Sequence, residues 1–168
     1  MNRFADMSRV MRTLTLVAAA LLVAACARGP GGADLSTASL SIGKTTPGSG
    51  QDFVTNVGDR IFFETDSTNF TPTAIATLDK QITWLSQYSR YAFTIEGHAD
   101  ERGTREYNIA LGARRAAAVR EYFIARGIAA SRMRTISYGK ERPVAVCNDI
   151  SCWSQNRRAV IVLDNAGV

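Results

Sequence analysis

The sequence predicts an α/β sandwich, in which a mixed four-stranded sheet carries two helices packed on one face, in the order β-α-β-α-β-β. Two observations lead to this prediction. Short apolar segments alternate with two longer segments whose apolar residues recur at spacings of three and four, as on one face of a helix. Both longer segments also have end signals, with Thr71-Pro72 at the start of the first and Gly127 after the second.

The first half of the domain is predicted to begin near Asp52, with a strand over residues 60–64. A polar turn follows, and a helix then runs over residues 72–88. Strict alternation of large apolar residues predicts the next strand over residues 91–95. The apolar stripe of this first helix consists of Ile75, Leu78, Ile82 and Leu85.

The second helix is predicted over residues 105–126, and one position breaks its apolar stripe. Arg115 falls on the stripe, and a desolvated guanidinium without a partner costs several kcal/mol. The nearest candidate partner is Asp100, just after the preceding strand. We hypothesise that the two do not mainly pair with each other and instead hold the two ends of a zwitterion. The stripe itself consists of Leu111, Ala118, Val119, Tyr122 and Phe123.

The last part of the chain predicts two more strands, over residues 134–138 and 160–163. A turn over residues 139–143 follows the first of them, and residues 154–158 are interpreted as a short helix or turn. Residues 160–163 form a continuous apolar run, which suits a strand covered on both faces.

Residues 1–25 have the features of a lipoprotein signal peptide. Three arginines precede an apolar run of ten residues, which is too short to span a bilayer because spanning takes about 20. Small residues before Cys26 resemble a lipobox, so we expect Cys26 to become the first residue and to carry acyl and diacylglycerol lipid. An ordinary signal peptide cut at Ala25 is the alternative. Ala27 is not the aspartate associated with inner-membrane retention, which favours the outer membrane. The start codon is open among Met1, Met7 and Met11.

Residues 26–51 are predicted to be the lipidated N-terminus and a flexible tether, followed by the folded domain over residues 52–168. The segment is rich in Gly, Ser, Thr, Ala and Pro, and it has too few large apolar residues to fold by burying surface. A flexible chain of this length reaches roughly 25 to 30 Å on average.

Charge and polar pattern exclude two classes of function. Removing residues 1–25 lowers the formal net charge from +5 to +3, a mild excess that argues against a nucleic-acid partner and is compatible with an anionic wall polymer. His98 and Asp100 lie two residues apart, but no serine or cysteine nucleophile is marked by an elbow motif. We therefore predict that the protein is not an enzyme.

Two cysteines remain once Cys26 is assigned to lipid. Cys147 and Cys152 enclose a six-residue loop, and an even pair in an oxidising compartment favours a disulfide. Closing this loop contributes about 2 kcal/mol on the chain-entropy model. A zinc site lacks two further ligands, because His98 is the only histidine and lies on another element. We predict a disulfide and no metal.

Five sequence blocks stand in the order found in one family: GHADERGT (97–104), EYN (106–108), LGARRA (111–116), YGKERP (138–143) and NRRA (156–159). With the lipobox they resemble the peptidoglycan-associated lipoproteins of the Tol-Pal system, whose folded part is an OmpA-like domain, over about residues 55–165. The resemblance implies non-covalent binding of peptidoglycan through meso-diaminopimelate of the stem peptide, and so a tether between outer membrane and wall.

The resemblance also implies the principal ligand contacts. The aspartate of the GHAD block corresponds to Asp100, and the second arginine of the RRA block corresponds to Arg115. The free end of diaminopimelate carries an ammonium and a carboxylate, which require an acceptor and a bidentate donor. The alternatives are an internal ion pair of Arg115 with Asp100 or Glu96, and a helix-entry role for Asp100.

Further contacts follow from the resemblance. The first-strand block departs from the family pattern and reads FFETDS, so Asp66 is the expected match and Glu64 stays an alternative. Arg114 is interpreted as a solvated or fold-supporting residue. The remaining expected contacts are Thr65, Asn108, Asn156 and Arg157.

The resemblance implies protein partners as well. Relatives bind a TolB-like periplasmic propeller and a TolA-like inner-membrane partner over a surface that overlaps the wall site. The alternative function is therefore a module that mainly docks these periplasmic Tol proteins. No cofactor is expected besides the lipid on Cys26.

Overall fold

The computed structural model describes residues 45–164. The predicted signal peptide, the lipid on Cys26 and most of the predicted tether lie outside this part of the chain. Within it, no helix is long and apolar enough to cross a membrane. The principal elements are β1 (Arg60–Phe62), α3 (Pro72–Gln87), β2 (Phe93–His98), α4 (Arg105–Ile124), β3 (Met133–Gly139) and β4 (Arg158–Leu163), with the short helices α2 (Gly50–Asp52), η2 (Phe53–Val57), η3 (Ala130–Arg132) and α5 (Ile150–Asn156).

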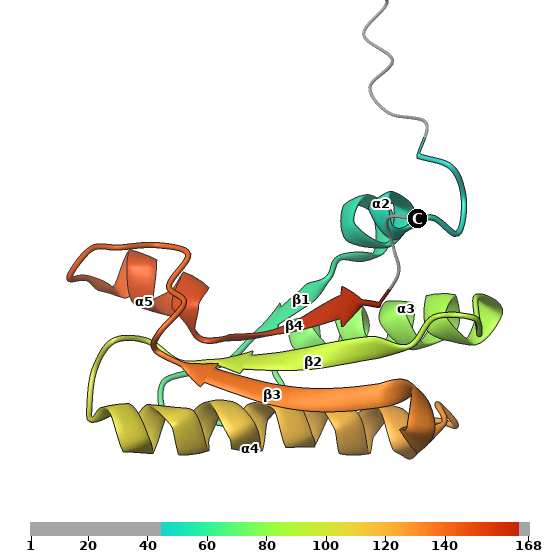
Figure 1. Ribbon diagram of the computed structural model, residues 1–168. Helices are drawn as coiled ribbons and strands as arrows, with labels where there is room; N and C mark the ends of the chain where they lie inside the picture. The colour runs from blue at the N-terminus through green and yellow to red at the C-terminus, as the bar shows by residue number, and fades with distance from the viewer. Residues whose placement is uncertain (1–44, 165–168) are drawn as a thin grey trace, which may run out of the picture. The chain divides into compact units, whose positions relative to one another are not determined.

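The four strands form one mixed sheet in the order β1-β4-β2-β3 (Figure 1). Strands β2 and β3 pair in parallel, whereas β4 runs antiparallel to both β1 and β2. One apolar core joins α3, α4 and the helix-facing residues of the sheet, including Ile61, Ile95 and Ile161. The predicted α/β sandwich with two helices on one face is therefore confirmed.

Both long helices begin at a threonine cap. The Thr71 hydroxyl accepts a hydrogen bond from the amide of Ala74 at 3.1 Å, and Pro72 occupies the first turn. The Thr104 hydroxyl accepts in the same way from the amide of Tyr107 at 3.2 Å. These caps confirm the predicted helix starts. The Thr104 cap also fixes the end of α4 that lies nearest the polar turn after β2.

The buried stripes of the helices differ from the predicted ones at particular positions. Ile75 is 38% exposed, and Ala74 takes its place against the core. Ala118 and Tyr122 are only half-buried, whereas Ala116 is fully buried. The spacing of apolar residues limits the inward face to an arc, and the position of the sheet selects which residues within the arc are covered.

Strand β4 was expected to be covered on both faces, and this expectation is wrong. Val162 is 41% exposed, although Ile161 beside it is buried. Both long helices pack on one side, so alternate residues of this central strand point to the face that neither α3 nor α4 covers.

Folded structure begins before the predicted boundary at Asp52. The Gly48 carbonyl accepts a hydrogen bond from the Tyr91 hydroxyl at 2.8 Å. The Asp52 carboxylate accepts from the indole nitrogen of Trp84 at 2.9 Å and from the Gly48 amide at 2.8 Å. Residues 45–51 are thus fastened by polar contacts, which hydrophobic patterning does not reveal.

Candidate ligand-binding site

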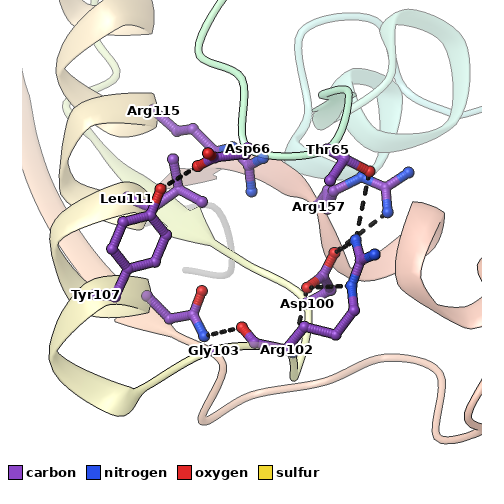
Figure 2. Close-up of a pocket in the computed structure, with 10 residues that line it drawn as sticks. Thr65, Asp66, Asp100, Arg102, Gly103, Tyr107, Leu111, Arg115 and Arg157 are labelled. Carbon is purple, nitrogen blue, oxygen red and sulfur yellow. Dashed lines mark hydrogen bonds and ion pairs between the residues drawn. The ribbon is translucent and has the colours of Figure 1, made fainter.

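A cavity of about 260 Å³ opens where β2 ends and α4 begins (Figure 2). Asp100 and Arg115, the two residues of the zwitterion hypothesis, both line it. The lining carries three guanidinium groups and two carboxylates, so it offers donors and acceptors within one small volume. The full lining is Thr65, Asp66, Asp100, Arg102, Gly103, Tyr107, Asn108, Leu111, Arg115 and Arg157.

Arg115 is fully buried, and its hydrogen-bond partners are backbone carbonyls. Nε donates to the Ser67 carbonyl at 3.0 Å, Nη1 to that of His98 at 2.7 Å and Nη2 to that of Glu64 at 3.0 Å. Its Cζ lies 5.0 Å from the centroid of the Phe63 ring. Among residues 45–164, no carboxylate oxygen lies within 4.0 Å of its nitrogens. The predicted alternative of an internal ion pair is therefore absent from this part of the chain.

This arrangement leaves Arg115 with unused binding capacity. A guanidinium has five N–H donors, of which three are bonded within residues 45–164, so two have no partner in that range and remain for a ligand in the cavity. Burial lowers the pKa of Arg115 to about 10, the charge of Arg157 acts in the same direction, and Asp100 opposes the shift. The group stays protonated at neutral pH, and a bound carboxylate would stabilise its charge.

Asp100, by contrast, is surrounded by donors. Its Oδ1 accepts from the Arg102 amide at 3.3 Å and from Arg102 Nε at 3.2 Å. Its Oδ2 accepts from Arg102 Nη2 at 2.6 Å and from Arg157 Nη1 at 3.3 Å. Burial raises the pKa of Asp100, but the hydrogen bonds from Arg102 and Arg157 outweigh it, and the net shift is downward. Asp100 is therefore an ionised acceptor at neutral pH.

Asp66 lies across the cavity from Asp100 and Arg102 (Figure 2). Its φ of 53° lies in the left-handed region, which aspartate tolerates better than most residues. This conformation brings its carboxylate to the Tyr107 hydroxyl, which donates a short hydrogen bond to it. That bond is the main reason why the pKa of Tyr107 is raised. The first-strand turn and the first turn of α4 are thus joined across the cavity.

Most of the secondary contacts expected from the sequence also line the cavity. Thr65, Asp66, Asn108 and Arg157 do so, which favours Asp66 over Glu64, whose side chain lines a neighbouring cavity. The fifth expected contact, Asn156, does not line the cavity.

Asn156 lies elsewhere. Its Oδ1 accepts from the amides of Val144 at 2.8 Å and Ala145 at 3.2 Å, and its Nδ2 donates to the Ala145 carbonyl at 2.8 Å. These three side-chain hydrogen bonds all go to the loop after β3, so Asn156 supports this loop and does not line the cavity.

Comparison with known proteins assigns the family. Residues 62–157, over half of the chain, match the model of the OmpA family. A relative from Rhizobium meliloti (strain 1021), named peptidoglycan-associated lipoprotein, is 68% identical over 134 residues, covering 80% of this chain and 76% of the relative. The chain belongs to the OmpA family and, within it, to the peptidoglycan-associated lipoproteins. This confirms the family resemblance and agrees with the prediction of a protein that is not an enzyme.

A further relative and two solved structures also resemble this chain. A peptidoglycan-associated lipoprotein from Mesorhizobium japonicum is 56% identical over 168 residues and covers 99% of both chains. The crystal structure of the peptidoglycan-associated lipoprotein from Burkholderia pseudomallei superposes with a TM-score of 0.61 at 39% identity, over 63% of this chain and 90% of that one. A MotB domain from Helicobacter pylori shares the fold at 20% identity and a TM-score of 0.59, over 64% of this chain and 84% of that one.

The cavity of this OmpA domain includes residues that the sequence did not single out as contacts. Arg102 and Tyr107 provide polar groups, and Leu111 provides an apolar wall. Arg102 belongs to the polar turn after β2, where any charged residue is expected at the surface. Tyr107 precedes Asn108 on the first turn of α4, and its contact with Asp66 comes from a distant turn that no spacing pattern predicts.

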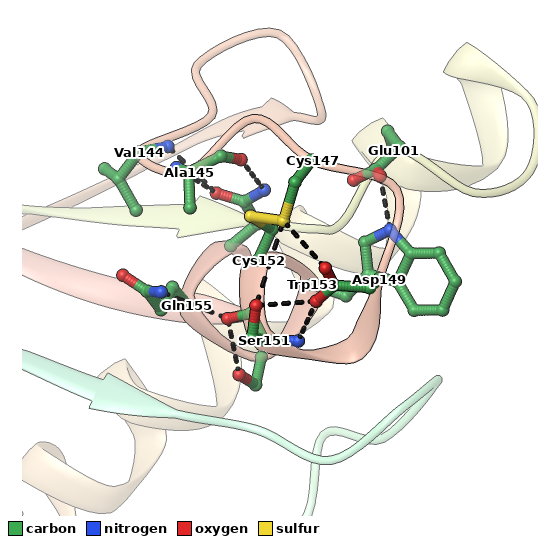
Figure 3. Close-up of a disulfide and its surroundings, with 11 residues drawn as sticks. Glu101, Val144, Ala145, Cys147, Asp149, Ser151, Cys152, Trp153 and Gln155 are labelled. Atoms are coloured by element: carbon green, nitrogen blue, oxygen red, sulfur yellow. Dashed lines mark hydrogen bonds between the residues drawn. A yellow bond between two sulfur atoms is a disulfide. The ribbon is translucent and has the colours of Figure 1, made fainter.

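The predicted disulfide between Cys147 and Cys152 is confirmed (Figure 3). It closes the loop that leads into α5, whose start is capped by Asp149. Trp153, which directly follows Cys152, donates a hydrogen bond from its indole nitrogen to the Glu101 carboxylate. The disulfide loop thereby contacts the same turn that carries Asp100.

Metal binding has no support in the described range. Residues 45–164 contain no group of three or more His, Cys, Asp or Glu side chains placed to hold an ion.

Proposed function

We propose that this chain binds peptidoglycan non-covalently through the free end of meso-diaminopimelate. The observation that carries the proposal is the buried Arg115, which has no carboxylate partner among the described residues, in one cavity with Asp100. A zwitterionic head group carries the two charges that such a pair complements. The names of the relatives and the OmpA family support the choice of wall polymer.

The chemistry of the site gives each residue a role. The two remaining N–H groups of Arg115 bind the ligand carboxylate in a fork, which suits the planar geometry of both groups. Asp100 accepts hydrogen bonds from the ammonium, and Leu111 contacts the carbon chain. Each sheltered, charge-assisted hydrogen bond contributes roughly 1.5 to 3 kcal/mol. Micromolar binding, about −8 kcal/mol, is therefore within reach of a few such contacts.

In the cell, we propose that lipid on Cys26 holds the outer membrane while the domain, facing the periplasm, holds the wall as part of the Tol-Pal system. Support comes from the lipobox and from the lipoprotein names of the relatives. Many copies bind a repeating polymer, so avidity multiplies a modest affinity at each site.

Sedimentation with purified sacculi tests the wall site. Asp100→Ala and Arg115→Lys should each reduce the bound fraction, and the double variant should lose binding. Arg114→Ala is the matched control, because this neighbouring arginine does not line the cavity. Circular dichroism confirms that each variant is folded. Wall fragments with lysine in place of diaminopimelate lack the second carboxylate and should bind weakly. Undiminished binding by the folded double variant would remove the proposal.

A second role is docking of TolB-like and TolA-like periplasmic proteins. The observation that favours it is a set of exposed apolar side chains on the loop before α5 and at the start of that helix, where Val146 is 87% exposed, Ile150 60% and Val144 53%. Exposed apolar groups of this kind are typical of protein contacts. Soluble wall peptide should displace a propeller partner if one surface serves both ligands. A ternary complex would show that the surfaces are separate.

A further inference from the structure

Asp100 has no free acceptor position for an incoming ammonium. An ionised carboxylate offers about four lone-pair sites, and Asp100 receives four donors, three of them from Arg102 and one from Arg157. A ligand ammonium can therefore bind Asp100 only if at least one donor leaves. The identity of that donor decides how the site recognises its ligand.

The two arginines differ in how firmly they are held. The side chain of Arg157 is 5% exposed, and its Nε also donates to the buried Phe63 carbonyl at 3.0 Å. The side chain of Arg102 is 40% exposed, and its only other side-chain hydrogen bond to a residue in the range 45–164 is a long one of 3.3 Å to the Thr65 hydroxyl. Moving Arg102 therefore leaves no buried carbonyl without its donor, whereas moving Arg157 leaves the Phe63 carbonyl without one.

A surface for the displaced guanidinium is already in place. Arg102 Cζ lies 4.3 Å from the centroid of the Trp153 ring, within the range of a cation–π contact. Trp153 is held by its hydrogen bond to Glu101 and by its position on α5, directly after the disulfide. Arg102 can thus rotate away from Asp100 while it keeps its contact with the ring.

We propose that Arg102 is a displaceable counter-ion of Asp100 and that it determines the specificity of the cavity for ligands with a cationic head. In the empty cavity it occupies the place of the ligand ammonium. The ammonium exchanges with it, and Trp153 retains the guanidinium at the rim. A ligand that lacks the cation offers nothing in exchange and is rejected. This inference rests on the proposed function, because it concerns ligand selection by the same cavity.

The exchange predicts opposite changes in ligand affinity when Arg102 and Trp153 are substituted. Arg102→Gln removes the competing charge, so the ligand should bind about three- to tenfold more tightly. Trp153→Ala removes the ring, which stabilises the released guanidinium more than one whose charge is already paired with Asp100, so displacement becomes more costly and affinity should fall about two- to fivefold, the range of an exposed cation–π contact. In the Arg102→Gln background, Trp153→Ala should have no effect.

Isothermal titration of the full chain in detergent with the tripeptide L-Ala-γ-D-Glu-meso-diaminopimelate measures these affinities. Arg105→Gln is the matched control, because this arginine pairs with Glu141 and does not line the cavity. Weaker binding by Arg102→Gln would overturn the inference and make Arg102 a ligand contact. An equal loss from Trp153→Ala in both backgrounds would also overturn it, because Trp153 would then act through the loop alone.

A spectroscopic readout separates exchange from general loosening. The sequence has two tryptophans, so Trp84→Phe leaves Trp153 as the only tryptophan, whose emission is excited selectively on the long-wavelength side of tyrosine absorption. Addition of the tripeptide should shift or quench its emission in this variant, and should do so much less after Arg102→Gln. An unchanged spectrum at saturating ligand would contradict the exchange. If the parent fails to bind the tripeptide, the proposed function fails first, and the two failures are distinguishable.

Discussion

Gly97 on β2 and Gly112 on α4 are in backbone contact, so that a Cβ added to Gly97 would lie 1.8 Å from the Gly112 carbonyl oxygen. A Cβ on Gly112 would in turn meet the Ser137 hydroxyl at 2.4 Å and the Gly97 carbonyl oxygen at 2.7 Å. This contact sets the distance between the strand that leads to Asp100 and the helix that carries Arg115. The geometry of the cavity therefore depends on two residues that do not line it.

Gly97→Ala should reduce both stability and affinity. The obstacle is backbone, which cannot rotate away, so α4 must shift, and overpacking of this kind costs about 1 to 3 kcal/mol. Urea denaturation should show the loss, and titration with the diaminopimelate tripeptide should show weaker binding. Gly127→Ala is the control for affinity: its φ of 89° makes alanine destabilising there too, but no atom lies within 4 Å of the added Cβ, so ligand binding should not change. Unaltered affinity in a folded Gly97→Ala variant would show that the helix position is not critical.

Arg115 should matter for the fold as well as for binding. Arg115→Met keeps much of the volume but leaves the carbonyls of Ser67, His98 and Glu64 without this donor. The bond to His98 is buried and the other two are partly buried; an unsatisfied buried group costs about 1 to 3 kcal/mol, so we expect a loss of about 3 kcal/mol in the free energy of unfolding. Chemical denaturation measures it. Arg114→Met, one position earlier and exposed, should change stability little. Equal stability of the two variants would contradict a structural role.

The sequence predicts the fold well because its signals are local. The threonine caps and the stripe spacing act within a few residues, and the structure confirms them. Arg115 was recognisable because a charged residue on an apolar stripe conflicts with its surroundings. Its partners were not recognisable, since carbonyls of the turn after β1 carry no side-chain signature. Asn156 was misplaced because the loop after β3, which no pattern describes, determines its contacts.

His98 should make stability depend on pH. The ring is buried, and neither nitrogen has a hydrogen-bond partner among the described residues. Burial lowers its pKa from 6.5 to about 4, with smaller contributions from the charges of Arg158, Arg142 and Arg60, although Glu96 lies 3.5 Å away. Between pH 4 and 6.5 the unfolded chain binds a proton that the folded chain does not. The free energy of unfolding should therefore rise with pH across this window, by up to about 3 kcal/mol.

Denaturation curves at several pH values of parent and His98→Phe check this dependence. Phenylalanine keeps an aromatic ring near Tyr138, whose ring centroid lies 5.6 Å from that of His98, but does not titrate. The slope between pH 4 and 6.5 should be smaller in the variant. Asp100 affects stability only at lower pH, because its pKa in the folded chain lies below the ordinary value of 3.8. Its contribution to the free energy of unfolding is lost as the pH falls through the folded-state pKa. Identical slopes above pH 4.5 would contradict the role of His98.

The disulfide should stabilise the domain and also support the cavity. Thiol titration of the denatured, unreduced chain should detect no thiols beyond any unlipidated Cys26. Cys147→Ser with Cys152→Ser should lower the free energy of unfolding by about 2 kcal/mol, because the unfolded chain regains the freedom of a six-residue loop.

Affinity should fall too, since the released loop leads directly into α5 and to Trp153, which contacts Glu101 and Arg102 beside Asp100. Tripeptide titration of the double serine variant, at a temperature where it is fully folded, measures this effect separately from stability. Dithiothreitol should reproduce it in the parent and leave the serine variant unchanged. Full affinity after reduction would mean that α5 is held by its other contacts, among them the cap at Asp149 and the bonds of Asn156 to the loop.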